Sequence, residues 1–164
     1  MLRAPQGGPE ARLAGDLFAA IEMRAWDRLE LMVDAEVIVD VHAEPHVKAR
    51  RNEHIWRSRS LRGLAQLHGY LMELNQAVPA LAVVPRATSR QDDHEVIRSD
   101  CAGVDGAGSP FDAVTDFSIW QRDGLLIRVD AEIADLAVGE DVIRQGEGDP
   151  RRYFRAFLHQ GGRV

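Results

Sequence analysis

Four charged residues lie within segments whose neighbours are mostly apolar, and they are the first candidates for chemistry. They are Asp40, Arg98, Asp100 and Asp116. A carboxylate in apolar surroundings is costly unless it is paired or used. Desolvation raises its pKa, which suits general acid or base catalysis near neutral pH. We therefore expect these residues to be candidates for acid–base chemistry. A structural ion pair is the alternative for each of them.

Four further residues are candidates for binding a substrate beside these charges. His42 shares a strand face with Asp40, so it is either a proton-transfer partner or a polar group at a strand end. His68 adjoins an apolar helical stripe, where a histidine is more often a structural residue. Tyr70 and Trp120 are most simply core aromatics, which also line the cavity if the fold encloses one.

Metal and nucleotide chemistry find no support in the sequence. His42 and His46 are four positions apart, but they cross a strand end and no third ligand accompanies them. No glycine-rich phosphate loop follows a predicted strand. We therefore expect no metal and no cofactor.

The composition is that of one acidic globular domain. The chain has 164 residues and a net charge of −6, which argues against binding to nucleic acid or to an anionic membrane surface. Its single cysteine, Cys101, excludes an internal disulfide. No apolar run approaches the roughly 20 residues of a spanning helix, and the N-terminus lacks a signal-peptide core. We expect a cytoplasmic protein.

Apolar periodicity predicts helices and one strand in the first half of the chain. An apolar face over residues 13–26 indicates a helix, and a second short helix follows from Asp27. Glu36–His42 is rich in β-branched residues and indicates a strand. Ser60 is expected to cap a third helix, whose leucine stripe spans residues 61–74.

The second half is predicted to be a run of antiparallel strands. They cover residues 80–87, 94–102, 111–122 and 125–135. Pro85 argues for an edge strand or a bulge, and Asp123-Gly124 is a two-residue hairpin signal. A regular hairpin between the second and third of these strands would place Arg98 opposite Asp116.

This order indicates an α+β fold with helices on one face of a curved sheet. Residues 1–8 are expected to form a flexible tail and residues 9–138 the folded domain. Residues 139–164 are expected to form a C-terminal extension with a short helix.

The order of elements and the ending Phe111–Ile127, with Asp135 beyond it, resemble the nuclear-transport-factor-two-like (NTF2-like) superfamily and most closely its SnoaL-like group. The resemblance covers residues 10–137. It implies a cone, in which a curved antiparallel or mixed sheet has N-terminal helices packed on its concave face around one apolar pocket. Relatives include polyketide cyclases, ketosteroid isomerases, limonene-type epoxide hydrolases and scytalone dehydratases, together with non-catalytic binding domains.

The same resemblance implies roles for the charged residues. Asp40 is similar in position to the base of ketosteroid isomerases, and Asp116 to their oxyanion-binding acid. Arg98-Ser-Asp100 resembles the Arg-x-Asp of limonene-type epoxide hydrolases. The second aspartate of those hydrolases falls on Ala131 here, so the set is incomplete unless a one-residue bulge turns Glu132 inward.

Together these observations predict a cofactor-independent enzyme that acts on a hydrophobic, oxygenated small molecule by acid–base chemistry. The resemblance alone implies that the reaction is cyclisation or isomerisation of a polyketide-like intermediate. The alternatives are epoxide opening or dehydration, ring closure promoted by pocket shape alone, and a non-catalytic dimeric ligand-binding domain. The resemblance also implies a homodimer, for which the outer sheet face around Arg128 is the expected interface.

Overall fold

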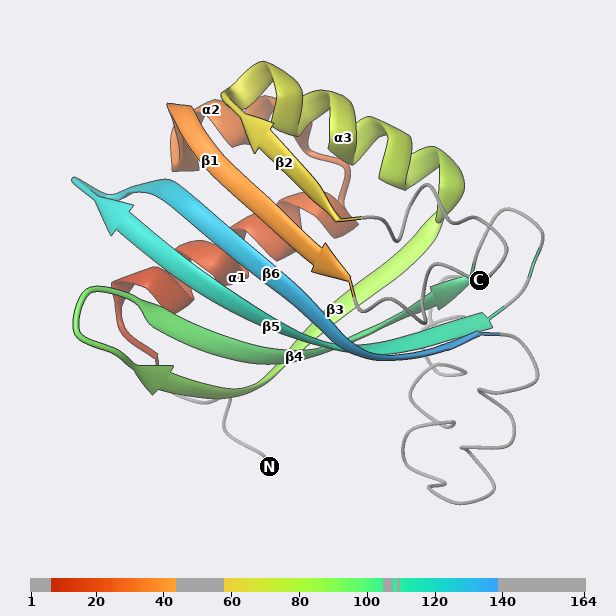
Figure 1. Ribbon diagram of the computed structural model, residues 1–164. Coiled ribbons are helices and arrows are strands. Elements are labelled where there is room, and N and C mark those ends of the chain that lie inside the picture. Colours follow the sequence, from red (N-terminus) through yellow and green to blue (C-terminus); the bar gives the residue numbers. More distant parts are fainter. Residues whose placement is uncertain (1–6, 44–57, 105–107, 109, 139–164) are drawn as a thin grey trace.

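A computed structural model describes residues 7–43, 58–104, 108 and 110–138 of the chain. Three α-helices, one short 3-10 helix and six strands follow one another in these ranges (Figure 1). In chain order they are α1 (Pro9–Glu22), η1 (Trp26–Arg28), α2 (Leu29–Met32), β1 (Val33–Ala43), β2 (Arg59–Arg62), α3 (Leu64–Ala77), β3 (Ala80–Arg90), β4 (Glu95–Val104), β5 (Pro110–Arg122) and β6 (Leu125–Val138).

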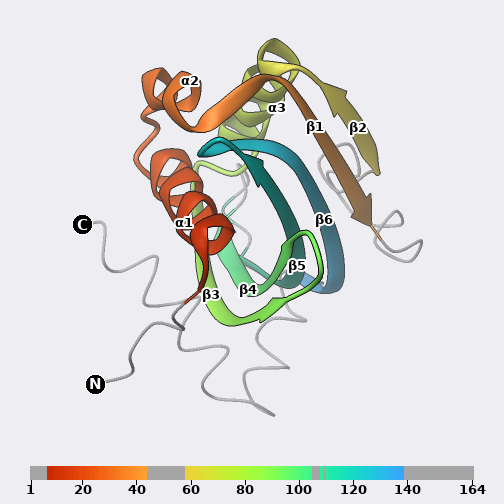
Figure 2. The ribbon, with the colours of Figure 1, turned by 90° about the vertical axis from the view of Figure 1, so that its left-hand side faces the viewer.

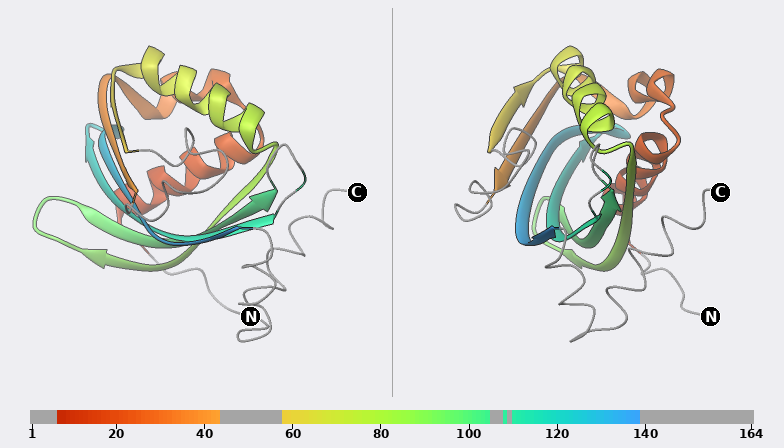
Figure 3. Two further views of the ribbon diagram at one scale, coloured as in Figure 1. Left: turned by 45° about the vertical axis from the view of Figure 1, so that its right-hand side comes forward. Right: turned by 90° about the vertical axis from the view of Figure 1, so that its right-hand side faces the viewer.

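The strands form one mixed sheet in the order β2-β1-β6-β5-β4-β3. The pair β1–β6 is parallel, and every other neighbouring pair is antiparallel. Figure 2 shows the sheet as an arc with α1 and α3 on its open side, and Figure 3 shows the same arrangement from two further directions. The predicted α+β cone, with its helices on the concave face of a curved sheet, is confirmed.

Helix α1 is held across the sheet at both of its ends. Near its N-terminus, the Glu95 carboxylate of β4 accepts a hydrogen bond from the Ala11 amide at 3.1 Å. Near its C-terminus, Glu22 accepts one from the Val83 amide of β3 at 3.0 Å. Between these ends the helix buries Leu17 and Phe18 against the sheet. The predicted first helix is confirmed but ends at Glu22, so that Trp26 lies in η1. The short second helix is confirmed from Leu29.

The start of the third helix differs from the prediction. Ser60 does not cap a helix, because Arg59–Arg62 form strand β2, which pairs antiparallel with β1. Gly63, with a φ of +87°, turns the chain from this strand into α3. The leucine stripe itself is confirmed from Leu64 onward.

The strand predictions for the second half are confirmed in type and order. Pro85 lies in the edge strand β3, and the pairing with β4 shifts just after it, so it marks both an edge and a bulge. Asp123 and Gly124 form the β5–β6 hairpin turn with φ values of +54° and +78°.

A bulge in β6 sets which of its side chains face the concave side. Trp120 pairs with Arg128 but the next residue of β5 pairs with Leu126, so Ile127 is an extra residue in β6. Leu126 and Val129 consequently both face inward, whereas strict alternation predicts Leu125 and Ile127 on the face of Val129.

Two predicted regions lie outside the described residues. They are most of the N-terminal tail and the C-terminal extension with its short helix. In the part of the chain that the structure describes, no helix is long and apolar enough to cross a membrane.

Candidate functional site

A cavity of about 140 Å3 lies between the concave face of the sheet and helices α1 and α3. Its walls come from alternate, inward-facing residues of the strands and from one face of each helix, because period-two alternation sends one side of every strand inward. The lining residues are Leu17, Phe18, Ile21, Val33, Val37, Val39, Val41, Leu67, Tyr70, Leu71, Leu74, Leu81, Val83, Cys101, Phe111, Ala113, Thr115, Phe117, Leu126, Val129, Ala131 and Ile133.

Only three of these lining side chains carry a polar atom, and none carries a charge. They are Tyr70 of α3, Cys101 of β4 and Thr115 of β5. The described part of the cavity wall is therefore an apolar surface with three neutral hydrogen-bonding groups. Such a wall suits an uncharged ligand, because a buried charge needs a partner that these residues do not supply.

Tyr70 is the one predicted binding residue that the structure places on the cavity. Burial raises the pKa of its phenol, and the Arg59 guanidinium lies 5.3 Å from the ring centroid. Arg59 in turn forms an ion pair with Glu73 at 2.9 Å. Tyr70 therefore stays protonated at neutral pH and can donate a hydrogen bond.

Cys101 and Thr115 are cavity residues that sequence reasoning did not single out. The Cys101 thiol donates a hydrogen bond to Thr115 Oγ1 at 3.7 Å, and burial raises its pKa to about 12. Since a thiolate is the reactive form, this cysteine is a poor nucleophile at neutral pH. Each residue adjoins an outward-facing carboxylate, Asp100 or Asp116, and this alternation is the signal by which they could have been found.

Asp40 lies on the outer face of β1, so the expectation that it faces the cavity is wrong. Its carboxylate accepts hydrogen bonds from Ser60 and from Arg62, the latter at 3.2 Å, and lies 3.5 Å from Arg128. The Ser60 hydrogen bond, followed by Arg62 and Arg128, lowers the pKa of Asp40. The valines that alternate with it, Val37, Val39 and Val41, face the cavity instead.

The cross-strand pairing of Arg98 with Asp116 is confirmed, but on the outer face of the sheet. The guanidinium binds both carboxylate oxygens, at 2.9 and 3.0 Å. Asp100 also faces away from the cavity and forms an ion pair with Arg86 of β3. None of these predicted catalytic side chains lines the cavity, because the residues that alternate with them, among them Ser99, Thr115 and Phe117, take the inner face.

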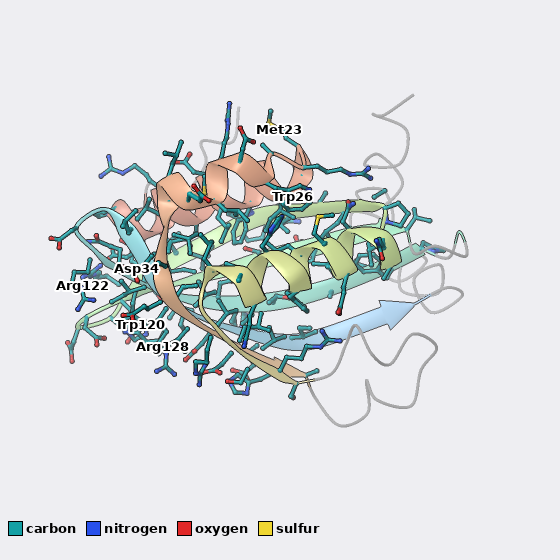
Figure 4. All side chains as sticks on the ribbon, turned by 90° about the horizontal axis from the view of Figure 1, so that it is seen from above. Met23, Trp26, Asp34, Trp120, Arg122 and Arg128 are labelled. Carbon is teal, nitrogen blue, oxygen red and sulfur yellow. The ribbon has the colours of Figure 1, made fainter. Side chains whose placement is uncertain are left out.

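Trp120, His42 and His68 also lie away from the cavity lining. Trp120 stacks on His94 with ring centroids 4.2 Å apart, and the Arg128 guanidinium lies 5.2 Å from the Trp120 ring (Figure 4). His42 and His68 are exposed on β1 and α3. Their predicted contact with a ligand in the cavity is therefore wrong.

Ala131 faces the cavity, as its position in the predicted strand requires, and the neighbouring Glu132 is exposed. The structure therefore supplies no carboxylate at the position of the second hydrolase aspartate. Within the described ranges, no three His, Cys, Asp or Glu side chains gather where they could hold a metal ion.

Comparison of the sequence with protein-family models and with curated proteins finds no match. Solved structures do match in fold. A candidate SnoaL-like polyketide cyclase from Jannaschia sp. CCS1 has 15% identity and a TM-score of 0.60, over 81% of this chain and 90% of its own. An NTF2-like protein from Burkholderia xenovorans LB400 has 16% identity and a TM-score of 0.61, over 77% of this chain and 89% of its own.

A candidate isomerase from Bacillus subtilis has 14% identity and a TM-score of 0.61, over 77% of this chain and 86% of its own. Likeness at such low identity establishes a shared fold and no more. The chain has the NTF2-like α+β cone fold, the fold also seen in SnoaL-like and ketosteroid isomerase-like proteins.

Proposed function

We propose that this protein binds a hydrophobic, uncharged small molecule inside the cone and acts on it as a cyclase or isomerase of a polyketide-like intermediate. The observation that carries the proposal is the cavity, whose described lining is apolar apart from Tyr70, Cys101 and Thr115. Cyclase and isomerase descriptions among proteins of this fold favour an organic small molecule over a macromolecule as the ligand.

The cavity volume limits how much of a ligand it can enclose. An engineered apolar cavity of about 150 Å3 is large enough to hold benzene. The 140 Å3 found here therefore suits one ring or an equivalent length of folded chain. Enclosure at this scale holds reacting carbons of one molecule close together, which favours ring closure and rearrangement.

The proposed chemistry uses shape and a neutral donor rather than a pair of carboxylates. Asp40 and Asp116 are bound by arginines on the outer face, so neither reaches a ligand in the cavity. Tyr70 is the strongest neutral donor on the cavity wall. It can polarise a ligand oxygen without losing its proton, since burial raises the pKa of its phenol.

A second candidate function is binding without turnover. It is favoured by the same observation, because no side chain that is ionised near neutral pH lines the described part of the cavity. The two candidate functions differ only in whether the protein converts the bound ligand into a product.

The test combines binding with conversion. Methylenecyclohexane is titrated into the protein and followed by NMR of the protein's methyl groups. Neutral polyenes able to close a ring are then incubated with the protein and analysed by chiral chromatography. The Asp116→Asn variant serves as the matched control on the outer face, and we expect it to retain both binding and conversion.

Binding together with formation of a single stereoisomer supports the enzyme, and binding without conversion supports the binding domain. Loss of conversion in Asp116→Asn with binding intact would show that the outer carboxylates do the chemistry and would overturn the proposal.

A further inference from the structure

Three small polar side chains meet on the inner faces of two neighbouring strands. Ser99 and Cys101 are successive inward residues of β4, and Thr115 of β5 lies directly opposite Ser99 in the antiparallel register. The Cys101 sulfur lies 3.7 Å from Thr115 Oγ1. Thr115 and Cys101 line the cavity and form a polar patch in its wall, whereas Ser99 is not part of the lining.

Ser99 has a hydroxyl without a partner. Its side chain is completely buried, and its Oγ forms no hydrogen bond within the described part of the protein. The adjacent residues, Arg98 and Asp100, point to the opposite face and form ion pairs there. A buried hydroxyl left unpaired is unfavourable, and native structures seldom retain one unless a water or ligand satisfies it.

The hydrogen bond between Cys101 and Thr115 has a defined donor and acceptor. The thiol donates and Thr115 Oγ1 accepts. Burial raises the pKa of Cys101 to about 12, so the thiol keeps its proton at neutral pH. A threonine hydroxyl carries one proton of its own, and that proton remains available for an acceptor other than the thiol. Thr115 therefore presents one donor toward the cavity.

We propose that Thr115 binds a neutral acceptor oxygen of the ligand, a carbonyl or ether oxygen, at the β4–β5 side of the cavity. The inference rests on the proposed function, since it names the chemical class of the ligand held in that cavity. An anionic oxygen is disfavoured, because no cationic side chain lies on the described lining.

The test uses two ring-sized probes that differ at one position. Cyclohexanone carries a carbonyl oxygen, and methylenecyclohexane carries a CH2 group in its place. Affinities are measured by NMR titration of the protein's methyl groups. The variants are Thr115→Val, which replaces the hydroxyl with a methyl group, and Ser99→Ala, which removes a hydroxyl outside the cavity lining. Thr88→Val in β3, away from the cavity lining, is the matched control.

We expect Thr115→Val to weaken cyclohexanone binding by roughly 2- to 12-fold, the range of one neutral hydrogen bond, and to leave methylenecyclohexane binding unchanged. Ser99→Ala and Thr88→Val should change neither affinity, since neither residue lines the cavity. The methylenecyclohexane affinity also reports whether each variant keeps its cavity.

A second readout needs no variant. The infrared carbonyl stretch of 13C-labelled cyclohexanone should lie at lower frequency when bound to the unmodified protein than in hexane. An unshifted carbonyl, or equal affinities for both probes that Thr115→Val does not alter, would overturn the acceptor site while leaving the cavity as a binding site. Failure of both probes to bind would instead contradict the proposed function.

Discussion

Replacing Ala131 with leucine should stabilise the protein and remove its ligand site at the same time. Ala131 is buried in β6 and faces the cavity. At about 24 cal/mol per Å3, the penalty associated with a cavity of 140 Å3 is about 3 kcal/mol. Leucine adds three carbons, and each buried CH2 contributes about 0.8 kcal/mol. The free energy of unfolding should therefore rise by about 2 kcal/mol.

The same substitution should lower methylenecyclohexane affinity roughly tenfold or more, because forcing a ligand into filled space costs about 1–3 kcal/mol. Urea unfolding measures the stability, and NMR titration measures the binding. Ala65→Leu is the matched control, since Ala65 is exposed on α3 and leucine is nearly as good a helix former as alanine. An Ala131→Leu protein that gains no stability and binds the probe unchanged would refute the assignment of this cavity.

Three further predictions concern residues whose environment the structure defines. The pKa of Asp40 is lowered by Ser60 and then by Arg62, so its stabilising contribution is present above its ordinary value of 3.8 and is lost as the pH falls through the lower, folded-state value. Ser60→Ala should therefore flatten the fall in melting temperature between roughly pH 4 and 2, and an unchanged slope would contradict this. Cys101 should react with a disulfide reagent at pH 8 at least roughly tenfold more slowly than free cysteine, because burial raises its pKa to about 12; a fast reaction would contradict its burial. If the outer sheet face forms the proposed homodimer, Arg128→Glu should shift sedimentation toward the monomer, and a monomeric unmodified protein would remove that proposal.

Much of the fold was predictable because its elements depend on local patterns. The apolar stripe of α1, the hairpin signal at Asp123-Gly124 and the alternation in β1 each act within a few residues. The pairing of Arg98 with Asp116 was also predictable, because a hairpin fixes its own register.

The face on which the charged residues lie was not predictable in the same way. Alternation shows that Asp40 and the adjacent valines lie on opposite sides, but the partners of Asp40 come from other strands. One of those strands is Arg59–Arg62, which was predicted to begin a helix. Because of that wrong prediction, Ser60 and Arg62 could not be recognised as partners of Asp40. The bulge at Ile127 likewise depends on the pairing of β6 with β5 and leaves no clear local signal.

The most direct test of the central claim is to locate a bound ligand by its contacts with two adjacent residues. Val39 lines the cavity, whereas Ile38 is on the opposite face of the same strand. Intermolecular NOEs from bound methylenecyclohexane should reach the methyl groups of Val39 and Ala131 and should be absent from those of Ile38. NOEs to Ile38 without any to Val39 and Ala131 would place the ligand on the outer face and contradict the account.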